Sequence, residues 1–380
     1  MLKRVATTLA SMLFTLWAVS TGTFLLMEHA PGGPDSAERR LEPMVEAASL
    51  AGMGLVRLVR SPCVGVLEWS AIKGSQLETG GPAAKVKGNP GCEINSDVSG
   101  TVYLNLLRSG QAARPGQIIM AVRPGILSRY FHTMASLARL DLGVTYSSRG
   151  ERTVRENLVQ TLPVSAAIGA LALAIAVLFG FPMGLVSAAR RGSWTDRVLT
   201  ALATAGVSAP AIVLGPCLLY VFAIKLPLFS PGGLESPLDL VLPSTTLGII
   251  LASVFQRMTR AGATGFLHGP IAMHLRARGL SEWRIAGIHA LRHAGIPMLG
   301  FMPPAIAGLL TGSLVVERIF NVPGVSRYLV GAALNRDHPM VLGVVLVYST
   351  ALVVLTTLAE ILYPLLDPRM KAQRSDRGAT

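Results

Sequence analysis

Apolar residues are concentrated in six long segments of the chain, separated by more polar stretches. A helix needs about 20 mostly apolar residues to cross a hydrocarbon core of about 30 Å. Five segments reach that length, and the fourth is shorter because it stops at Gln256 and Arg257. The pattern predicts six transmembrane helices, near 5–27, 162–188, 199–224, 241–258, 297–316 and 340–363.

The first segment follows Lys3 and Arg4, so its flank also fits a cleaved secretory signal peptide. Its apolar stretch exceeds the roughly 7–15 residues of a signal peptide, and no clean small-x-small cleavage site follows. An uncleaved first span is therefore the favoured interpretation.

Residues 31–125 are the longest interval of mixed character and are predicted to form a small α/β insert. Residues 36–60 have loose helical periodicity, and 75–90 are predicted to be a loop. Apolar runs bounded by Gly and Pro signals predict strands at 64–69, 101–106 and 117–122. No repeat of about 20–50 residues is evident in the chain.

A helix is predicted directly after Pro124 and Gly125, because apolar residues recur there at helical spacing. Two interpretations of this helix stay open. It lies at the membrane surface, or its apolar side faces the core of the insert. The residues that carry the pattern are Leu127, Tyr130, Phe131, Met134, Leu137 and Ala138.

The predicted fold is an all-α polytopic membrane protein with a small α/β insert. Its parts are a first transmembrane helix (1–30), the insert (31–125), a core of five transmembrane helices (126–370) and a short tail (371–380). The core contains an Arg-rich connection, 257–296, that is long enough to suggest a role of its own.

Composition and charge agree with a membrane protein. Hydrophobic residues make up 51% of the chain and charged residues only 14%, whereas soluble chains carry about 25% charged residues. The net charge of +13 could attract nucleic acid, but the basic residues cluster beside the apolar segments. That placement follows the positive-inside bias of membrane proteins, so no nucleic-acid partner is expected.

The short connections predict the orientation, because Arg and Lys favour the cytoplasmic side. Arg190, Arg191 and Arg197 follow the second span, six arginines lie in 257–296, and basic residues follow the sixth span. Both termini are therefore predicted to be cytoplasmic, and the insert periplasmic.

The sequence contains none of the common catalytic motifs for ATP hydrolysis, zinc binding or hydrolase activity. It contains no G-x-x-x-x-G-K-[ST] phosphate loop, so ATP hydrolysis would need another subunit. His289 and His293 are spaced to share one helix face, but no third ligand follows, so a metal site is not expected. Paired zinc cysteines and hydrolase motifs are also absent.

The spans carry small residues and prolines in place of the mid-membrane charges of ion-coupled carriers. Gly180 and Gly184, like Gly308 and Gly312, have the spacing that lets helices approach closely. The Ser208-Ala209-Pro210 segment and the Pro303-Pro304 pair are predicted to break or kink helices around a pathway. Lys225 and Glu317 are expected at external helix ends, within reach of water.

A series of motifs resembles the oligopeptide, dipeptide and nickel permease family of ABC importers. The EAA loop of that family is resembled by three consecutive motifs: Arg276-Ala277-Arg278-Gly279-Leu280-Ser281-Glu282, then His289-Ala290-Leu291-Arg292-His293-Ala294, then Ile296-Pro297. Similar motifs recur in the family's order over residues 1–34 and about 126–370. They include 30–34, 141–143, 162–163, 190–197, 311–317, Phe320, 323–324, 336–339 and 367–369.

The resemblance implies a permease subunit of an inner-membrane, binding-protein-dependent importer. A second permease, related or identical, would complete a twelve-helix pore. Two cytoplasmic ATPase subunits would drive it, and a periplasmic binding protein would deliver the solute, with no cofactor on this chain. Residues 276–282 would form the ATPase-coupling loop, with Gly279 at a turn or close approach. Met273, His274 and Leu275 depart from the start of the EAA motif.

Cys63 and Cys92 are predicted to form a disulfide, because the predicted topology places both in an oxidising compartment. Cys217 lies within the third span, beyond reach of the insert. Two buried free thiols are the alternative.

Two other classes of function compete with a permease. In one, a membrane-anchored enzyme or sensor acts through residues 35–125, although their carboxylates are scattered. An ion-coupled carrier is disfavoured by the lack of mid-membrane charge.

Overall fold

The computed structural model describes residues 2–29, 43–52, 56–87, 92–97, 99–145, 152–335 and 337–366. The chain divides into two compact units. One, the helical unit, comprises Met1–Met12, Gln160–Arg327 and Tyr348–Thr380, and the other comprises Leu13–Val159 and Tyr328–Val347. Each unit is described by itself below.

The helices follow the predicted spans closely. They are α1 (Leu2–His29), α4 (Val154–Ile175) continued by η3 (Ala176–Gly180) and α5 (Phe181–Ala189), α6 (Trp194–Ser208), α7 (Ala211–Leu219) with η4 (Tyr220–Lys225), η5 (Pro237–Leu240) with α8 (Val241–Leu267), α9 (Pro270–Ala277), α10 (Glu282–Arg284) with η6 (Ile285–Ala290), α11 (Leu291–Ile319), α12 (Ser326–Leu334) and α13 (His338–Leu366).

Among the described residues, four helical segments are long and apolar enough to cross a membrane. They are Ala10–His29, Val154–Ala189, Pro237–Leu267 and His338–Leu358. The bent pair α6 and α7 adds a fifth if it counts as one span. The fifth predicted span, 297–316, lies inside the 29-residue helix α11. These helices support a polytopic helical membrane protein.

Helix α8 is the centre of the helical unit and contacts α5, α6, α7 and α11. Two glycines, Gly184 of α5 and Gly180 at the end of η3, allow the close approach to α8. A Cβ added to Gly184 would lie 2.6 Å from Cβ of Thr259, and one added to Gly180 would collide with the backbone of Ala252. The predicted close packing of this Gly-x-x-x-Gly pair is confirmed, because η3 and α5 meet α8 with no room for side chains there.

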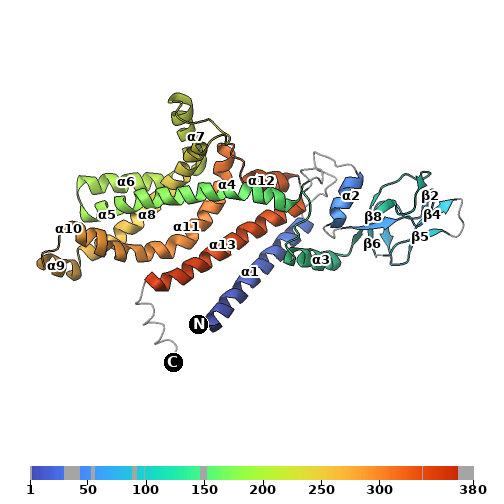
Figure 1. Cartoon of the computed structure of the whole chain (residues 1–380), viewed down its shortest axis with the longest axis horizontal. Coiled ribbons are helices and arrows are strands. Elements are labelled where there is room, and N and C mark those ends of the chain that lie inside the picture. Colours follow the sequence, from blue (N-terminus) through green and yellow to red (C-terminus); the bar gives the residue numbers. More distant parts are fainter. Residues whose placement is uncertain are drawn as a thin grey trace. The chain divides into compact units, whose positions relative to one another are not determined.

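The proline-containing segments behave differently from each other. Helix α6 ends at Ser208, and α7 starts after Pro210 at an angle of 105°, so the predicted break is confirmed (Figure 1). Pro210 sets this boundary, because a proline disfavours helical geometry in the residue before it. In contrast, α11 continues through residues 303 and 304, so a break at that pair is wrong, and a kink there stays a prediction.

The second unit contains a domain of strands, named here the β domain (residues 56–124), and one short helix precedes it. Its strands are β1 (Arg57–Arg60), β2 (Gly65–Trp69), β3 (Gln76–Leu77), β4 (Pro82–Lys87), β5 (Glu93–Asn95), β6 (Gly100–Asn105), β7 (Ala112–Ala113) and β8 (Ile118–Pro124). They form two four-stranded sheets, β1-β8-β6-β3 and β5-β4-β2-β7, in which every pairing is antiparallel. Figure 1 shows α2 (Pro43–Gly52) beside these strands.

The three predicted strands are confirmed as β2, β6 and β8. Two other expectations are wrong. The helix expected over 36–60 is limited to α2 in its described part, since β1 occupies 57–60, and the loop expected over 75–90 contains β3 and β4. Lys85 and Lys87 alternate with the buried Ala84 and Val86, so β4 is a half-buried strand.

The β domain is an internal repeat, which the sequence did not reveal. Exchanging β1–β4 for β5–β8 converts one sheet order into the other, with a shift of 35 or 36 residues. The hydrogen bonds repeat as well: the Gly74 amide donates to the Val102 carbonyl, and the Gly110 amide donates to the Leu67 carbonyl. The repeat lies mainly in backbone geometry: the turn glycines Gly74 and Gly80 recur as Gly110 and Gly116, all at positive φ, whereas most other side chains differ.

The two sheets enclose one apolar core, which includes Leu67, Val102, Ile119 and Met120. Cys63 and Cys92 pack against this core and are joined as a disulfide, with their Cα atoms 6.7 Å apart. The two cysteines precede β2 and β5, which belong to one sheet. The link therefore ties the first half of the repeat to the second.

Candidate functional site

The Arg-rich connection is shorter than the predicted 257–296, because α8 continues to Leu267 and α11 begins at Leu291. Residues 268–290 form the short helical segments α9, α10 and η6, with a tight turn between α9 and α10. Gly269 precedes α9, and Pro270 occupies its first turn, where proline is well tolerated. The helix ends in a Schellman motif: the Gly279 amide donates to the Arg276 carbonyl and the Leu280 amide to the Leu275 carbonyl. Gly279 has φ of +81°, the left-handed conformation that this position requires.

The structure distinguishes between the two roles expected for Gly279. A Cβ added there would meet no atom within 4 Å. Among the described residues nothing approaches Gly279 closely, whereas the turn is confirmed by its backbone conformation. The glycine is needed for its conformation, because a side chain at positive φ is strained even where space is available.

Arg276 connects three helices at this turn. Its Nε and Nη2 atoms donate to the Glu282 carboxylate at 2.6 and 3.1 Å, and Nη1 donates to the Leu267 carbonyl at 3.0 Å. The hydrogen bond from Arg276 lowers the pKa of Glu282 below its ordinary value. Arg276 thereby links the end of α8, helix α9 and the start of α10.

One side of the connection is anchored in an apolar cluster. Ala272 of α9 is fully buried with Leu267 of α8, Ile285 of η6 and Ala188 of α5, and Leu275 and Leu280 pack against them. Figure 1 shows α9 and α10 at one end of the helical unit, beside α5, α6 and α8. A displacement of α9 would therefore act directly on the ends of α5 and α8.

The other side of the connection is exposed and combines apolar and cationic groups. Trp283 is 84% exposed, Met273 64% and Ile271 51%, and Arg278 and Arg284 are exposed near them. Met273 and His274, which depart from the EAA pattern, lie on this outer side, whereas Leu275 packs against the cluster. Exposed Trp and Arg are the residue types that most often anchor protein interfaces.

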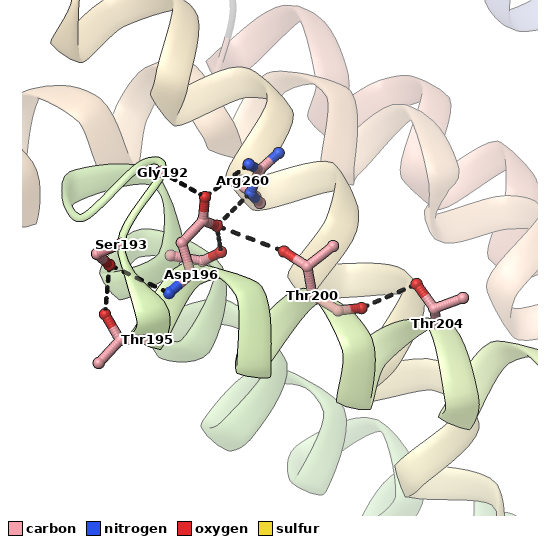
Figure 2. A network of polar contacts seen from close by, with 8 residues as sticks. Gly192, Ser193, Thr195, Asp196, Thr200, Thr204 and Arg260 are labelled. Carbon is pink, nitrogen blue, oxygen red and sulfur yellow. Dashed lines mark hydrogen bonds and ion pairs between the residues drawn. The ribbon is translucent and has the colours of Figure 1, made fainter.

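A buried ion pair lies at the same end of the helical unit (Figure 2). Asp196, in the first turn of α6, accepts hydrogen bonds from Nε and Nη2 of Arg260 at 2.7 and 2.9 Å. The Ser187 hydroxyl and the Gly192 amide also donate to this carboxylate, and Thr200 lies 3.4 Å from it. The network joins α5, α6 and α8.

This network explains why α8 is longer than the sequence predicted. The fourth span was expected to stop near 258 because its apolar stretch ends at Gln256 and Arg257, but the helix continues to Leu267. Arg260 is accommodated because Asp196 neutralises its charge at a partly buried position. The Asp196–Arg260 pair was missed from the sequence, where 64 residues separate its members.

The residues predicted to line a pathway or to pack helices do not gather at one place in the described structure. Ser208 and Pro210 are exposed at the break between α6 and α7. Gly308 is also exposed, and a Cβ there would meet no atom of the described residues within 4 Å. The surroundings of Gly312 lie outside the described residues.

Glu317 is not within reach of water, in contrast to the prediction. Its side chain is fully buried, and its Oε2 accepts a hydrogen bond from the Ser326 amide at 3.0 Å. Gly324 has no room for a Cβ because the Glu317 carboxylate and the Ser165 hydroxyl occupy that space. The turn after α11 folds back over the carboxylate, which explains the burial. Lys225 is exposed as predicted.

Two further motifs meet within the second unit. The Thr145 hydroxyl donates to Asp337, and Asp337 caps α13 by accepting the Met340 amide at 3.2 Å. Asp141, Leu142 and Gly143 of one motif and His338 and Pro339 of the other line one pocket, although they are far apart in the sequence.

In the helical unit, His293 stacks on Phe266, with ring centroids 4.5 Å apart.

Comparisons with known proteins agree with these features. Residues 180–372 match the family of binding-protein-dependent transport system inner membrane components. The chain is 32% identical over 249 residues to the dipeptide transport system permease DppB of Bacillus subtilis, covering 66% of this chain and 80% of that protein. It is 31% identical over 271 residues to the oligopeptide permease OppB of Salmonella typhimurium, covering 69% and 88%.

A solved structure of the MetNI methionine ABC transporter is also similar, with 17% identity and a TM-score of 0.44 over 55% of this chain and 96% of that one. The family match and the two permeases settle the classification. This chain belongs to the family of binding-protein-dependent transport system inner membrane components.

Proposed function

We propose that this chain forms half of the translocation pore of an ATP-driven importer for peptides or a related small solute. The membership of the family carries this proposal, and the relatives named as dipeptide, oligopeptide and glutathione permeases indicate the solute class. A second permease would complete the pore, two ATPase subunits would hydrolyse ATP, and a periplasmic binding protein would deliver the solute. The chain itself would bind no cofactor.

The proposed topology has six spans, with both termini in the cytoplasm and residues 31–125 in the periplasm. The Arg-rich connections support it, because they lie at one end of the helical unit. Ala188, just before Arg190 and Arg191, shares an apolar cluster with Ala272 and Leu267. A common cytoplasmic side for both connections follows from the positive-inside bias. Helix α11 would supply the fifth span.

The coupling loop would transmit ATPase movement through α9. Its outer side, with Trp283 and Arg278, offers apolar and cationic groups to a soluble partner. Its inner side is packed on α5 and α8, and Arg276 joins the three helix ends. The Asp196–Arg260 pair would keep α6 and α8 together while α9 moves.

Pathway residues are proposed on the helices that break or lack close neighbours. Ser208 and Pro210 at the bend of α6 and α7, and Gly308 and Gly312 on α11, would face the second permease or the solute. Glu317 would position the turn after α11, because its carboxylate holds the Ser326 amide.

Purification of the complex tests this function. The tagged chain should retain two ATPase subunits, and the reconstituted complex should accumulate a peptide in liposomes only with ATP and the binding protein. Trp283→Asp should release the ATPase, because it places a charge on the apolar outer side of the coupling loop. Ile72→Asp is the matched control, since Ile72 is also exposed but lies in the β domain.

Retention of the ATPase by the Trp283 variant would contradict the docking assignment. A complex without any ATPase subunit would contradict the proposed function.

A further inference from the structure

Helix α3 (Ile126–Ala138), which directly follows β8, buries polar residues and exposes apolar ones, unlike a helix on a water-soluble domain. Its buried residues are polar: Arg129 and Thr133 are each more than nine-tenths buried. Its exposed residues include Leu127, 70% exposed, and Phe131, 67% exposed. A helix on a soluble domain shows the opposite arrangement, with its apolar stripe towards the core.

The exposed surface of α3 is itself divided along its length. At 100° per residue, one strip consists of apolar residues and the neighbouring strip of polar residues. The apolar strip comprises Leu127, Phe131, Ala135 and Ala138, and the polar strip comprises Ser128, His132 and Arg139. This division matches a helix at the boundary between acyl chains and headgroups.

The buried polar side of α3 is locked to α1. Arg129 donates from Nη2 to Glu28 at 2.7 Å and from Nε to the Pro124 carbonyl at 3.0 Å. Arg123, at the end of β8, donates to the same carboxylate at 3.1 Å. An arginine with its donors engaged in this way fixes orientation better than a lysine could.

Aromatic side chains continue the contact along α1. The Tyr130 hydroxyl accepts the Trp17 Nε1 proton at 2.9 Å and lies 3.0 Å from the Thr21 hydroxyl, and the Phe24 ring meets the Tyr130 ring edge-on. Tyr and Trp with hydrogen-bonded polar ends are typical of the membrane interface.

Because α3 is fixed to α1, whether α1 lies in lipid bears directly on whether α3 contacts lipid. The apolar stretch Ala10–His29 is a candidate span and is hardly covered by the rest of the chain. Leu25 and Leu26 are exposed close to the point where α3 attaches. Both helices therefore expose apolar side chains, Leu25 and Leu26 on α1 and Leu127 and Phe131 on α3.

We propose that α3 is an interfacial helix whose strip of Leu127, Phe131, Ala135 and Ala138 contacts the acyl chains of the lipid bilayer. The proposal rests on the proposed function only for the placement of α1 as a span. Only Gly125 separates α3 from β8, so the helix would anchor the last strand of the β domain at the lipid surface. This selects the first of the two interpretations that the sequence left open.

Spin-label accessibility in lipid nanodiscs tests the proposal on the full complex. Single cysteines replace Leu127 or Phe131 and, as matched controls on the polar strip, Ser128 or His132, in a Cys217→Ser background that keeps the Cys63–Cys92 pair. The ratio of collisions with lipid-soluble oxygen to collisions with a water-soluble nickel chelate should be severalfold higher at 127 and 131 than at 128 and 132.

Nickel access at 127 and 131 would overturn the proposal, because the strip would face water. Protection from both reagents there would also overturn it, because protein would cover the strip. A label at Leu26 on α1 separates this failure from a failure of the topology. If the label at Leu26 is accessible to oxygen while the label at 127 is accessible to the nickel chelate, α1 is a span and only the placement of α3 is wrong.

Discussion

In the helical unit, side chains decide how the elements pack, whereas in the β domain the backbone itself joins the elements. In the helical unit, backbone hydrogen bonds are satisfied inside each helix, so side-chain size and side-chain polarity decide how helices meet. Gly184 against Thr259 and Asp196 against Arg260 are two such contacts. In the β domain, backbone hydrogen bonds join the elements themselves, and a disulfide adds a covalent link.

The two sheets of the β domain carry different outer side chains at equivalent positions, which backbone pairing permits. At equivalent register positions, Leu58 pairs with Ala121 beneath α2, while Glu93 pairs with Lys85 on the other sheet. One outer surface is apolar and covered, and the other carries an ion pair. Because the backbone holds both sheets, their outer side chains diverged without loss of the fold. The helical unit has no comparable freedom where its helices touch.

The largest effect is expected at the contact of η3 with α8, where Gly180 lies. Gly180→Leu would push a side chain into the backbone of Ala252, which cannot move without displacing α8. Overpacking costs about 1–3 kcal/mol even where neighbours adjust, so the variant should fail to yield a folded, membrane-inserted chain. Gly169→Leu on α4 is the control, because a Cβ there meets nothing within 4 Å. Equal yields of the two variants, measured by size-exclusion chromatography after extraction, would contradict the packing argument.

The next effect is expected from the buried ion pair. Asp196→Ala leaves Arg260 partly buried without its carboxylate, which should destabilise the helical unit by about 2–4 kcal/mol. Thermal unfolding in nanodiscs measures it, with Arg257→Ala as the control because Arg257 is exposed. A double variant, Asp196→Asn with Arg260→Gln, should recover part of the loss. No difference between Asp196→Ala and the control would mean that the network is not structural.

The disulfide should matter about as much to the β domain. Cys63→Ser opens a link between residues 29 positions apart, and closing such a loop contributes roughly 3–4 kcal/mol in the chain-entropy model. Proteolysis of the β domain should accelerate, while Cys217→Ser should have no effect on it. Mass spectrometry of non-reduced peptides checks the link first. Free alkylation of both cysteines before reduction would remove it and weaken the periplasmic placement.

A smaller loss of stability, but a large loss of transport, is expected at the coupling loop. Gly279→Val imposes a branched side chain on a residue with φ of +81°, which costs about 1–2 kcal/mol. The turn should open, and ATP hydrolysis should no longer drive uptake, although the chain still inserts. Gly279→Asn should retain most coupling, because Asn adopts left-handed geometry more readily. Normal assembly and transport by the Val variant would refute the role of this turn.

The smallest effect is expected on the outer surface of the β domain. The Lys85–Glu93 pair spans 3.4 Å, and both side chains are more than half exposed. Such pairs contribute about 0.2–1 kcal/mol, so a double-mutant cycle with Lys85→Ala and Glu93→Ala should give a coupling energy in that range. A coupling energy as large as that of Asp196 with Arg260 would erase the distinction between the two regions.

The sequence by itself determined where the helices and several strands lie. Long apolar segments, Pro210 and the Gly-x-x-x-Gly pair are local patterns with local consequences, so the long apolar helices, the break and the close packing could be predicted. The coupling turn could be predicted as well, because a glycine after an amphipathic segment commonly ends a helix in left-handed geometry. The motifs also indicated the correct family.

Only the tertiary structure decided what distant residues do to one another. Asp196 and Arg260 pair across 64 residues, Glu317 is buried by a turn that follows it, and the β domain repeats its hydrogen bonds without repeating most of its side chains. The same holds for α3, whose periodicity fits water or lipid equally well until its neighbours are known. Burying Arg129 against Glu28 turned the apolar strip outwards. Periodicity reports that a helix has two sides, and packing decides which of them faces the protein.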